Sequence, residues 1–463
     1  MSLDCKDTMY AQVEELVSRF AADAGLVGLK SEQASASASP AGSTSAAREA
    51  RATSSNYIEL LRHKALIGAP MAGVSDRTYR IMSYLGGAAA CVSEMVSVAG
   101  LFYKSSGSWD LVEPSPYEPP LIVQLFGSVP QQFVYATQHI SQRLGQRLRA
   151  IDINMACPVS KVVKKGEGAS LMNTPEAAAE IVRAVVSAAP CPVTVKIRRG
   201  YDLAHDTSLA FAETLVDAGA EAIEMHGRFA KQLYKGDSNL DAIRHLARVI
   251  DVPVVASGDM FSADHVAKSL CGSELASVMI ARGTYGNPWI FRDAREKIQA
   301  WEKLHVNPQA QVEGEMNPQV KLQVNSQAQV EGDMNPQLNP QLNPQLNPQL
   351  NPQLNPLIAG QAAMLTQTLT PGPSLTPTPS NRVKRALIDP IHSYHERLTA
   401  LELHLRLLDC LGAHMYRGRS LASWYVQGLP LAREARQAFM EAKDLDDFLR
   451  ALDSYTNTLD ALC

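Results

Sequence analysis

Short apolar runs alternate with helix-like segments from Lys64 onward, and this alternation constrains the fold more than any other feature of the chain. The runs lie at residues 65–69, 88–92, 121–125, 148–153, 192–197, 222–225, 252–256 and 278–281. Each is followed by a segment long enough for a helix, which predicts a series of βα units. Eight units in about 240 residues favour a closed parallel (β/α)8 TIM barrel, usually about 250 residues long. A doubly wound open sheet is the alternative.

The segment after Thr174 illustrates how the helix starts are encoded. Thr174 is suited to cap the first turn and Pro175 to occupy the first helical position. Apolar residues between 181 and 186 then form one face of a helix. We therefore expect a helix that begins at Pro175 and packs on the sheet.

The chain divides by composition into four parts. Residues 1–56 are expected to be an N-terminal extension, partly disordered, in which Met9–Leu26 has the spacing of a loose helix and 31–55 is rich in Ser and Ala. The barrel is expected at 57–301. Residues 382–463 have apolar residues at helical spacing, most clearly at 395–411, 420–426 and 434–462, and are expected to form a small C-terminal helical bundle.

Residues 302–381 differ from everything around them. The segment Asn307–Gln319 recurs at Asn325–Gln337 with small changes, and five copies of NPQL follow between Asn335 and Leu354. A proline in every fourth position prevents a continuous helix, and the polar repeats supply no core. A disordered repeat linker is predicted, either a partner-binding tether or, as we favour, a repeat expansion tolerated between domains.

The overall composition is typical of a soluble globular protein, with 46% hydrophobic and 19% charged residues. Neither a long apolar run nor a basic N-terminus followed by an apolar segment is present, so a cytoplasmic protein without a membrane partner is expected. Seven cysteines without a CxxC pair indicate neither a disulfide framework nor a zinc site, and no metal is predicted. The net charge of -4 argues against indiscriminate nucleic-acid binding.

Reactive side chains follow the predicted strands. Cys157 comes just after the strand at 148–153 and is followed by a lysine-rich loop. The catalytic groups of a TIM barrel gather at the carboxyl ends of its strands, and the loops after the last two strands commonly hold a phosphate. Here those loops are 257–259 and 281–283, where small residues and Arg282 suit a phosphorylated ligand.

Nine motifs in order give the chain a specific resemblance. They are Ala69–Asp76 (APMAGVSD), Ser93–Met95 (SEM), Val123–Gly127 (VQLFG), Asp152–Val159 (DINMACPV), Lys161–Gly166 (KVVKKG), Val195–Arg198 (VKIR), His226–Arg228 (HGR), Tyr234–Gly236 (YKG) and Asn287–Phe291 (NPWIF). This series resembles the tRNA-dihydrouridine synthases, most closely the bacterial B-type branch, over residues 64–295, with a looser helical match at 395–455.

The resemblance implies an FMN enzyme that uses NADPH (or NADH) to reduce the C5–C6 double bond of a uridine in tRNA. It also implies roles for individual residues. Cys157 is expected to be the catalytic proton donor, since a thiol of ordinary pKa stays protonated at neutral pH. The residues expected to bind FMN are Pro70, Met71 and Ala72 against the flavin ring, Gln124 and Lys196 at its polar edge, His226 near the flavin chain, and Ser257, Gly258, Asp259, Ala281 and Arg282 around the phosphate.

The substrate tRNA needs cations around the site, because its phosphates must be held while the stacked uridine is withdrawn. Candidate tRNA contacts are Asn154, Lys161, Lys164, Lys165, Arg198, Arg228, Arg417 and Arg419. The protein is expected to act as a monomer. The sequence leaves open which uridine is reduced, which nicotinamide cofactor is preferred and what the repeat linker does.

Other interpretations remain at this stage. Cys157 is alternatively a buried structural thiol, His226 a core histidine, Lys196 a lysine that extends along the barrel wall, and Asp259 a helix N-cap. For the whole protein, an FMN oxidoreductase acting on a free pyrimidine, similar to the dihydroorotate dehydrogenases, is the second enzyme candidate. A non-catalytic tRNA-binding protein is the third possibility.

Overall fold

A computed structural model of the chain describes residues 3–26, 57–115, 118–305 and 392–462. These residues belong to one compact unit, which comprises Met1–Val306 and Ala386–Cys463. The predicted Ser/Ala-rich segment and the NPQL repeats lie outside the described residues. Residues 302–305 of the predicted linker, in contrast, form the last turn of a helix.

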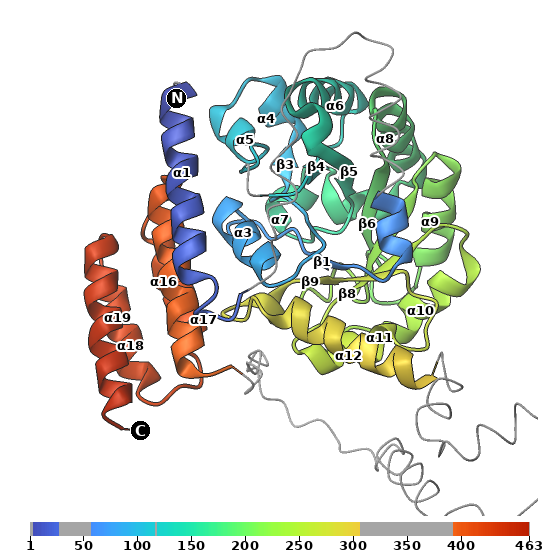
Figure 1. Cartoon of the computed structure of the whole chain (residues 1–463). Coiled ribbons are helices and arrows are strands. Elements are labelled where there is room, and N and C mark those ends of the chain that lie inside the picture. The colour runs from blue at the N-terminus through green and yellow to red at the C-terminus, as the bar shows by residue number, and fades with distance from the viewer. Residues whose placement is uncertain (1–2, 27–56, 116–117, 306–391, 463) are drawn as a thin grey trace, which may run out of the picture. The chain divides into compact units, whose positions relative to one another are not determined.

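The centre of the unit is a parallel sheet with the strand order β2-β1-β9-β8-β7-β6-β5-β4-β3 (Figure 1). Its strands are β1 (Leu66–Gly68), β2 (Ala90–Cys91), β3 (Val96–Ser97), β4 (Leu121–Phe126), β5 (Leu148–Asn154), β6 (Val193–Arg198), β7 (Ala222–His226), β8 (Val254–Ser257) and β9 (Ser277–Ile280). A parallel bridge from Val92 to Ile122 joins the end of β2 to β4 and closes the sheet. The predicted barrel is thus confirmed, and the open-sheet alternative is wrong.

Each predicted apolar run overlaps one barrel strand, with bounds that differ by at most two residues. The structure adds β3, which the sequence pattern missed because the second barrel strand is interrupted at Ser93–Met95 and resumes for only two residues. β3 pairs with the carboxyl end of β4 and therefore widens the rim at that point.

Helices surround the strands and connect them (Figure 1). They are α3 (Arg77–Leu85), α4 (Val98–Phe102), α5 (Ser106–Asp110), α6 (Pro130–Leu144), α7 (Ser160–Val163), α8 (Pro175–Ala188), α9 (Ser208–Asp217), α10 (Leu240–Val249), α11 (Ala263–Leu270) and α12 (Ile290–His305). Short 3-10 turns lie at η1 (Gly145–Arg147), η2 (Gly168–Asn173) and η3 (Arg282–Thr284). α8 begins at Pro175 as predicted, but Thr174 makes no side-chain cap, and its Oγ1 instead lies 3.5 Å from the Leu171 carbonyl.

Side chains alternate between two cores because successive residues of a strand point to opposite faces. Outward residues such as Ile151 and Ile153 pack with the helices, whereas Ala150 joins an inner cluster. Tyr57 and Leu61, from the helical residues 57–62, close the bottom of that inner cluster. The apolar floor leaves the upper interior of the barrel to polar residues.

A second helical layer combines the two ends of the chain. Its helices are α1 (Leu3–Phe20), α16 (Tyr394–Cys410), α17 (Arg417–Tyr425), α18 (Ala432–Glu441) and α19 (Leu445–Asp460). Val13 and Ala24 are fully buried in the same cluster as Leu401, Phe439 and Phe448. The N-terminal helix is therefore a packed element, not the loose helix expected from its sequence.

The C-terminal helices follow their local signals with one change. The run expected at 434–462 divides in two, since Asp444 caps α19 by accepting from the N–H of Asp447. Ser393 and Glu396 form a capping box at the start of α16. None of the helices that the structure describes has the length and hydropathy of a membrane span.

Candidate functional site

The carboxyl ends of the strands bring the sequence-predicted residues to one rim of the barrel. The pairing aligns Gln124 with Asp152, Asn154 with Lys196, and His226 with Ser257. These residues have the inward parity of their strands, because the intervening residues belong to the outer core. One rim of the barrel therefore carries the amide of Gln124, the amine of Lys196, the imidazole of His226 and the loop that contains Cys157.

Asn154 fixes the loop that carries Cys157. Its Oδ1 accepts from the N–H groups of Cys157 at 2.9 Å and Ala156 at 3.2 Å, and its Nδ2 donates to Gln124 Oε1 at 2.8 Å. On the other side, Arg198 Nε donates to the Ala156 carbonyl at 2.8 Å. The half-buried thiol consequently has a defined position, and Asn154 orients Cys157 through its backbone.

The electrostatic surroundings keep Cys157 protonated. Burial raises the pKa of the thiol above its ordinary value, although the N–H of Val159 and the positive charge of Arg198 act in the opposite direction. Lys161, which follows in the exposed loop, is not among the groups that shift this pKa. The sulfur is therefore a neutral acid near pH 7, as a proton donor must be.

Three ionisable groups meet inside the barrel below the thiol loop. Asp152 accepts from Gln124 Nε2 at 2.6 Å and from Thr194 Oγ1 at 2.9 Å. Burial lowers the pKa of Lys196, while the carboxyls of Glu224 and Asp152 act to raise it. Burial raises the pKa of Asp152 to about 6 and that of Glu224 well above its ordinary value.

Hydrogen bonding decides which carboxyl holds the proton in this group. Asp152 has two donors, whereas neither oxygen of Glu224 has a hydrogen-bond partner among the described residues. A buried carboxylate without donors is unfavourable, so Glu224 is the protonated acid and Asp152 the anion beside Lys196. The negative charge of Asp152 and the positive charge of the Lys196 ammonium then balance each other inside the barrel.

His226 is held as a neutral imidazole. Its Nε2 lies 3.3 Å from Arg228 Nη1, and because a guanidinium can only donate, Nε2 is the acceptor and Nδ1 carries the hydrogen. Burial lowers the pKa of His226 well below its ordinary value, helped by neighbouring arginines and Lys196. The imidazole thus presents one N–H donor at the rim.

The loop after β8 forms a cradle of unusual backbone geometry. Gly258 and Asp259 both have positive φ, of 113° and 56°. A Cβ on Gly258 would lie 2.4 Å from Ser238 Oγ, so only glycine fits there. Within the described residues, the N–H groups of Gly258, Asp259 and Met260 donate to no protein acceptor. Donors of this kind suit an anion such as a phosphate.

The carboxylate of Asp259 organises the cations at this cradle. It accepts from the Ser238 N–H at 2.8 Å and pairs with Arg228 at 2.7 Å and Arg282 at 3.3 Å. Asp259 is not a helix N-cap, since the side chain of Ser262 caps α11. Arg282 remains partly exposed beside the cradle, where a bound anion can reach it.

The loop after β1 supplies the apolar wall of the site. Pro70 and Met71 are half-buried, and Ala72 is exposed. Tyr285, which lies just after η3, donates its hydroxyl to Met71 Sδ at 3.5 Å. The sequence analysis missed both Tyr285 and Glu224. No local pattern marks Tyr285, whereas a charge inside an apolar strand is a signal that could have identified Glu224.

The predicted tRNA contacts divide into exposed and buried groups. Lys161, Lys164 and Lys165 are exposed at and after α7. Arg198 is only 2% exposed and donates to three backbone carbonyls, those of Ala156, Phe229 and Leu233, and Arg228 is also 2% exposed. The assignment of these two arginines to phosphate contacts is corrected, because their cations are buried and used by the protein.

The two candidates in the C-terminal helices also have protein partners. Arg419 donates to the Ala442 carbonyl at the end of α18. Arg417 pairs with Asp76 at 2.8 Å and donates to the Gly73 carbonyl at 2.8 Å. No group of three or more His, Cys, Asp or Glu side chains in the described part of the chain is arranged to hold a metal ion.

Comparison with known proteins gives a consistent result. A family profile described as dihydrouridine synthase (Dus) matches residues 67–334. The tRNA-dihydrouridine synthase B of Shewanella oneidensis is 36% identical over 239 residues, which cover 52% of this chain and 73% of that protein. Proteins of the same name from Klebsiella pneumoniae and Pseudomonas aeruginosa are 36% and 35% identical, over 76% and 74% of their lengths and 53% and 54% of this chain.

Proposed function

This chain belongs to the dihydrouridine synthase family, in its B-type branch, and we propose that it reduces the C5–C6 double bond of specific uridines in tRNA. The observation that carries the proposal is the position of Cys157. A half-buried thiol with a raised pKa is held just after β5, on the same rim of the barrel as a buried lysine and the anion cradle after β8. These are the parts that a reduction with proton delivery requires.

FMN is the proposed cofactor, and the residues present fit it. The cradle of Gly258 and Asp259 offers free N–H groups with Arg282 beside them, and Met71 offers an apolar wall. When bound, FMN supplies the hydride that adds to C6 of the uracil ring, with NADPH or NADH as the proposed source of electrons. The full set proposed to hold it is Pro70, Met71, Ala72, Gln124, Lys196, His226, Ser257, Gly258, Asp259, Ala281 and Arg282.

The polar residues of the interior supply fixed charge and donors. The carboxyls of Glu224 and Asp152 oppose the lowering of the Lys196 pKa by burial, and a positive charge on Lys196 favours a cofactor that becomes more negative on reduction. The Nδ1–H of His226 is a second donor at the rim. Their positions are set by the strands, so no reorganisation is needed when charge develops.

Cys157 is the proposed acid. As C6 gains a hydride, C5 must gain a proton, so the S–H bond of Cys157 breaks, a C5–H bond forms, and sulfur is left as a thiolate. The N–H of Val159 and the charge of Arg198 favour that thiolate. The sulfur of Cys157 is therefore protonated before the transfer, and the thiolate that remains after the transfer is stabilised by these two groups.

The exposed lysines 161, 164 and 165 are the proposed contacts to tRNA phosphates, since they are exposed in the segment that directly follows the Cys157 loop. Each neutralised phosphate should contribute a salt-dependent term to tRNA affinity. The cytoplasmic location and the monomeric state expected from the sequence remain predictions.

Assays with purified holoenzyme test the proposal. Unmodified tRNA incubated with NADPH should gain dihydrouridine at defined positions, as measured by mass spectrometry of nuclease fragments. Cys157→Ala should abolish product while the protein keeps its flavin and its tRNA affinity. Oxidation of dihydroorotate without any tRNA product would favour the free-pyrimidine alternative, and tRNA binding by a colourless protein would favour a non-catalytic role.

A further inference from the structure

One segment of the proposed cofactor site, Pro70–Asp76, is held in place by residues from distant parts of the chain. This segment, called the β1 loop below, follows β1 and carries the apolar wall. Internally, Met71 and Ser75 are joined by three hydrogen bonds, two of which use Ser75 Oγ. Gly73 has a positive φ of 75° at the tip. The loop protrudes, so its position depends on external contacts.

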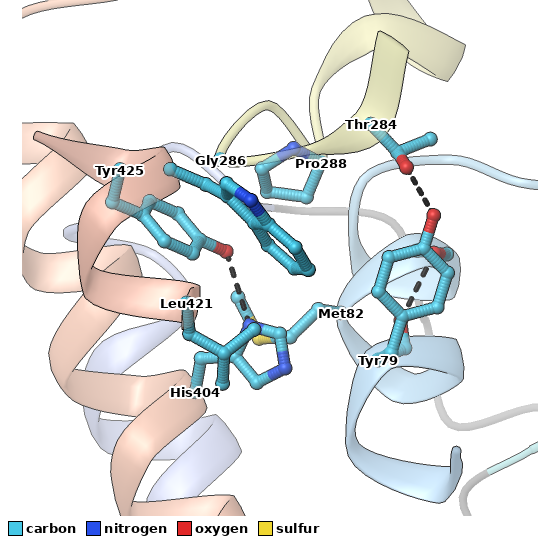
Figure 2. Close-up of a pocket in the computed structure, with 10 residues that line it drawn as sticks. Tyr79, Met82, Thr284, Gly286, Pro288, His404, Leu421 and Tyr425 are labelled. Carbon is cyan, nitrogen blue, oxygen red and sulfur yellow. Dashed lines mark hydrogen bonds between the residues drawn. The ribbon is translucent and has the colours of Figure 1, made fainter. Parts of the chain in front are cut away.

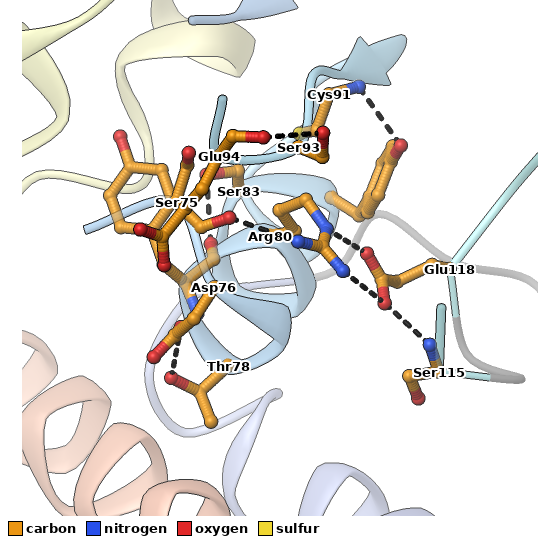
Figure 3. A network of polar contacts seen from close by, with 12 residues as sticks. Ser75, Asp76, Thr78, Arg80, Ser83, Cys91, Ser93, Glu94, Ser115 and Glu118 are labelled. Atoms are coloured by element: carbon orange, nitrogen blue, oxygen red, sulfur yellow. Dashed lines mark hydrogen bonds and ion pairs between the residues drawn. The ribbon is translucent and has the colours of Figure 1, made fainter. Parts of the chain in front are cut away.

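The barrel supplies the first set of contacts. Glu94 accepts from the N–H of Gly73, and Arg80 Nη1 donates to the Ser75 carbonyl at 2.9 Å. Arg80 is itself fixed by a buried pair with Glu118, as Figure 3 shows. These contacts hold the inner side of the loop.

Arg417 of α17 supplies the second set. Its guanidinium donates to the Gly73 carbonyl at 2.8 Å, pairs with Asp76 Oδ2 at 2.8 Å, and lies 3.7 Å from Glu94 Oε1. One planar cation thus bridges a loop carbonyl and two carboxylates. Lysine could not make this bridge, because it offers a single point charge instead of a fork.

Aromatic packing makes a parallel connection from α17 to the same loop. Trp424 stacks on Tyr285 with ring centroids 4.0 Å apart, and Tyr285 donates to Met71 Sδ. Gly286 permits the close approach, since a Cβ there would lie 2.5 Å from the Trp424 backbone. A cavity of only about 10 Å³ remains in this contact (Figure 2), which is no larger than one water needs.

A polar chain forms the third connection. Tyr425 and His404 are linked at 3.3 Å, as Figure 2 shows, and His404 contacts Thr78 Oγ1 at 3.4 Å. Thr78 in turn donates to Asp76 Oδ1 at 2.8 Å. Both carboxylate oxygens of Asp76 are therefore connected to the C-terminal helices. Oδ2 pairs directly with Arg417, and Oδ1 is connected through Thr78 to His404.

We propose that Arg417 is a positioning residue for the cofactor site, through which the C-terminal helices hold the β1 loop in its cofactor-binding conformation. The inference rests on the proposed FMN function. Without Arg417, the Gly73 carbonyl loses its donor, and Asp76 and Glu94 lose the cation between them. The loop then relaxes, and Met71 no longer has a fixed position.

A competing role exists for the same side chain. A pocket of about 300 Å³ lies between the β1 loop and α17, and Arg417, Tyr416 and Trp424 are among its lining residues. The Arg417 side chain is 23% exposed, so an RNA phosphate entering this pocket is the alternative partner. If Arg417 positions the β1 loop, its replacement should weaken FMN binding and leave RNA binding unchanged. If Arg417 contacts an RNA phosphate, its replacement should weaken RNA binding and leave FMN binding unchanged.

The experiment compares Arg417→Met, Arg417→Lys and a control, Arg433→Met, prepared as holoenzymes. Arg433 is exposed on α18, so its replacement makes the same charge change away from the β1 loop. FMN affinity is measured from the flavin fluorescence released on dilution, together with the flavin's visible absorption band. Affinity for tRNA is measured at several salt concentrations.

Arg417→Met should bind FMN about tenfold more weakly, the change expected for one lost charge-assisted hydrogen bond, and should alter the absorption band. Arg417→Lys should be intermediate, and Arg433→Met should match the unaltered protein. The salt dependence of tRNA binding should not change. If Arg417→Met is poorly folded, Arg417→Lys, which keeps the charge but not the fork, provides the same comparison.

Unchanged FMN affinity and absorption in a folded Arg417 variant would overturn the inference. If tRNA affinity fell instead and the salt slope decreased by about one phosphate, Arg417 would be an RNA contact. An unaltered protein that contains no FMN and binds none when FMN is added would overturn the proposed function itself, which is a separate and recognisable result.

Discussion

At the scale of single residues, the site depends on groups whose charge is set by burial. Burial raises the pKa of Cys157, lowers that of Lys196 against the opposing carboxyls of Glu224 and Asp152, and lowers that of His226. In each case desolvation is the largest cause, and neighbouring charges oppose it at Cys157 and Lys196 or add to it at His226. Protonation states can therefore be tested one residue at a time.

Alkylation tests the state of Cys157. Because burial raises the thiol pKa above its ordinary value, the rate of reaction with iodoacetamide should be low at pH 7 and should increase only in alkaline solution. The rate is measured by mass spectrometry of the peptide that contains Cys157. Cys271, whose pKa burial also raises, is an internal control in the same digest. A fast reaction of Cys157 alone at pH 7 would indicate an activated thiolate and contradict its proposed role as an acid.

At the scale of elements, the important contact joins α16 and α17 to α3 and the β1 loop. His404 on α16 is 2% exposed and lies between Tyr425 and Thr78. Gly286 lies against the backbone at the end of α17. The His404 contact is polar and depends on pH, whereas the Gly286 contact is steric. The two contacts can therefore be perturbed independently.

Acid should weaken the His404 contact. Burial lowers the pKa of His404 to about 4, so between pH 6.5 and 4 the unfolded state binds more protons than the folded state. Stability is therefore lost as pH falls through this window, by about 2 kcal/mol between pH 7 and pH 5 for this group. The difference between the urea unfolding free energies at pH 7 and pH 5 should be smaller by that amount in His404→Gln. Equal differences would show that His404 is already charged in the folded protein.

The steric contact is tested by Gly286→Ala against Gly412→Ala. Both glycines have positive φ, of 65° and 67°, but a Cβ at Gly412 meets nothing within 4 Å. Backbone strain is thus common to both variants, and the overlap with Trp424 adds about 2 kcal/mol of destabilisation only in Gly286→Ala. Chemical denaturation measures the two losses. A similar loss of stability in both variants would mean that α17 moves away from the added Cβ without an energetic cost.

At the scale of the whole molecule, the two ends of the chain share one core. α1 packs with α16, and the N-terminal Val13 lies in the same buried cluster as Phe448 of α19. Trp289 of the barrel region donates its indole N–H to the Ala24 carbonyl at 2.8 Å. The N-terminal helix is therefore part of the support beneath the elements that hold the β1 loop.

Truncation of one buried side chain measures this support. Val13 is 0% exposed, so Val13→Ala should destabilise the protein by about 2 kcal/mol through lost burial and a residual cavity. Glu15→Ala, on the exposed side of α1, is the control and should be nearly neutral. Urea unfolding of the full-length chain gives both values. If Val13→Ala behaves like Glu15→Ala, α1 does not pack in solution as described.

The sequence alone was sufficient to predict the barrel and the rim at which the candidate site lies, because both depend on local rules. Apolar runs of strand length, separated by segments of helix length, follow from backbone geometry, and they identified each of the eight main strands. The position of Cys157 just after β5 follows from chain order, so it was also predictable.

Only the tertiary structure decided which partners the charged residues have. Arg198 and Arg228 are read as surface cations in the sequence, yet Arg198 is buried by its inward position on β6 and Arg228 by its contacts with Gly236 and Asp259. Arg417 meets Gly73 across 344 residues of sequence, a pairing that no local pattern encodes. Residue type and spacing determine the secondary structure of a segment, whereas burial and long-range contacts determine the partners of its charged side chains.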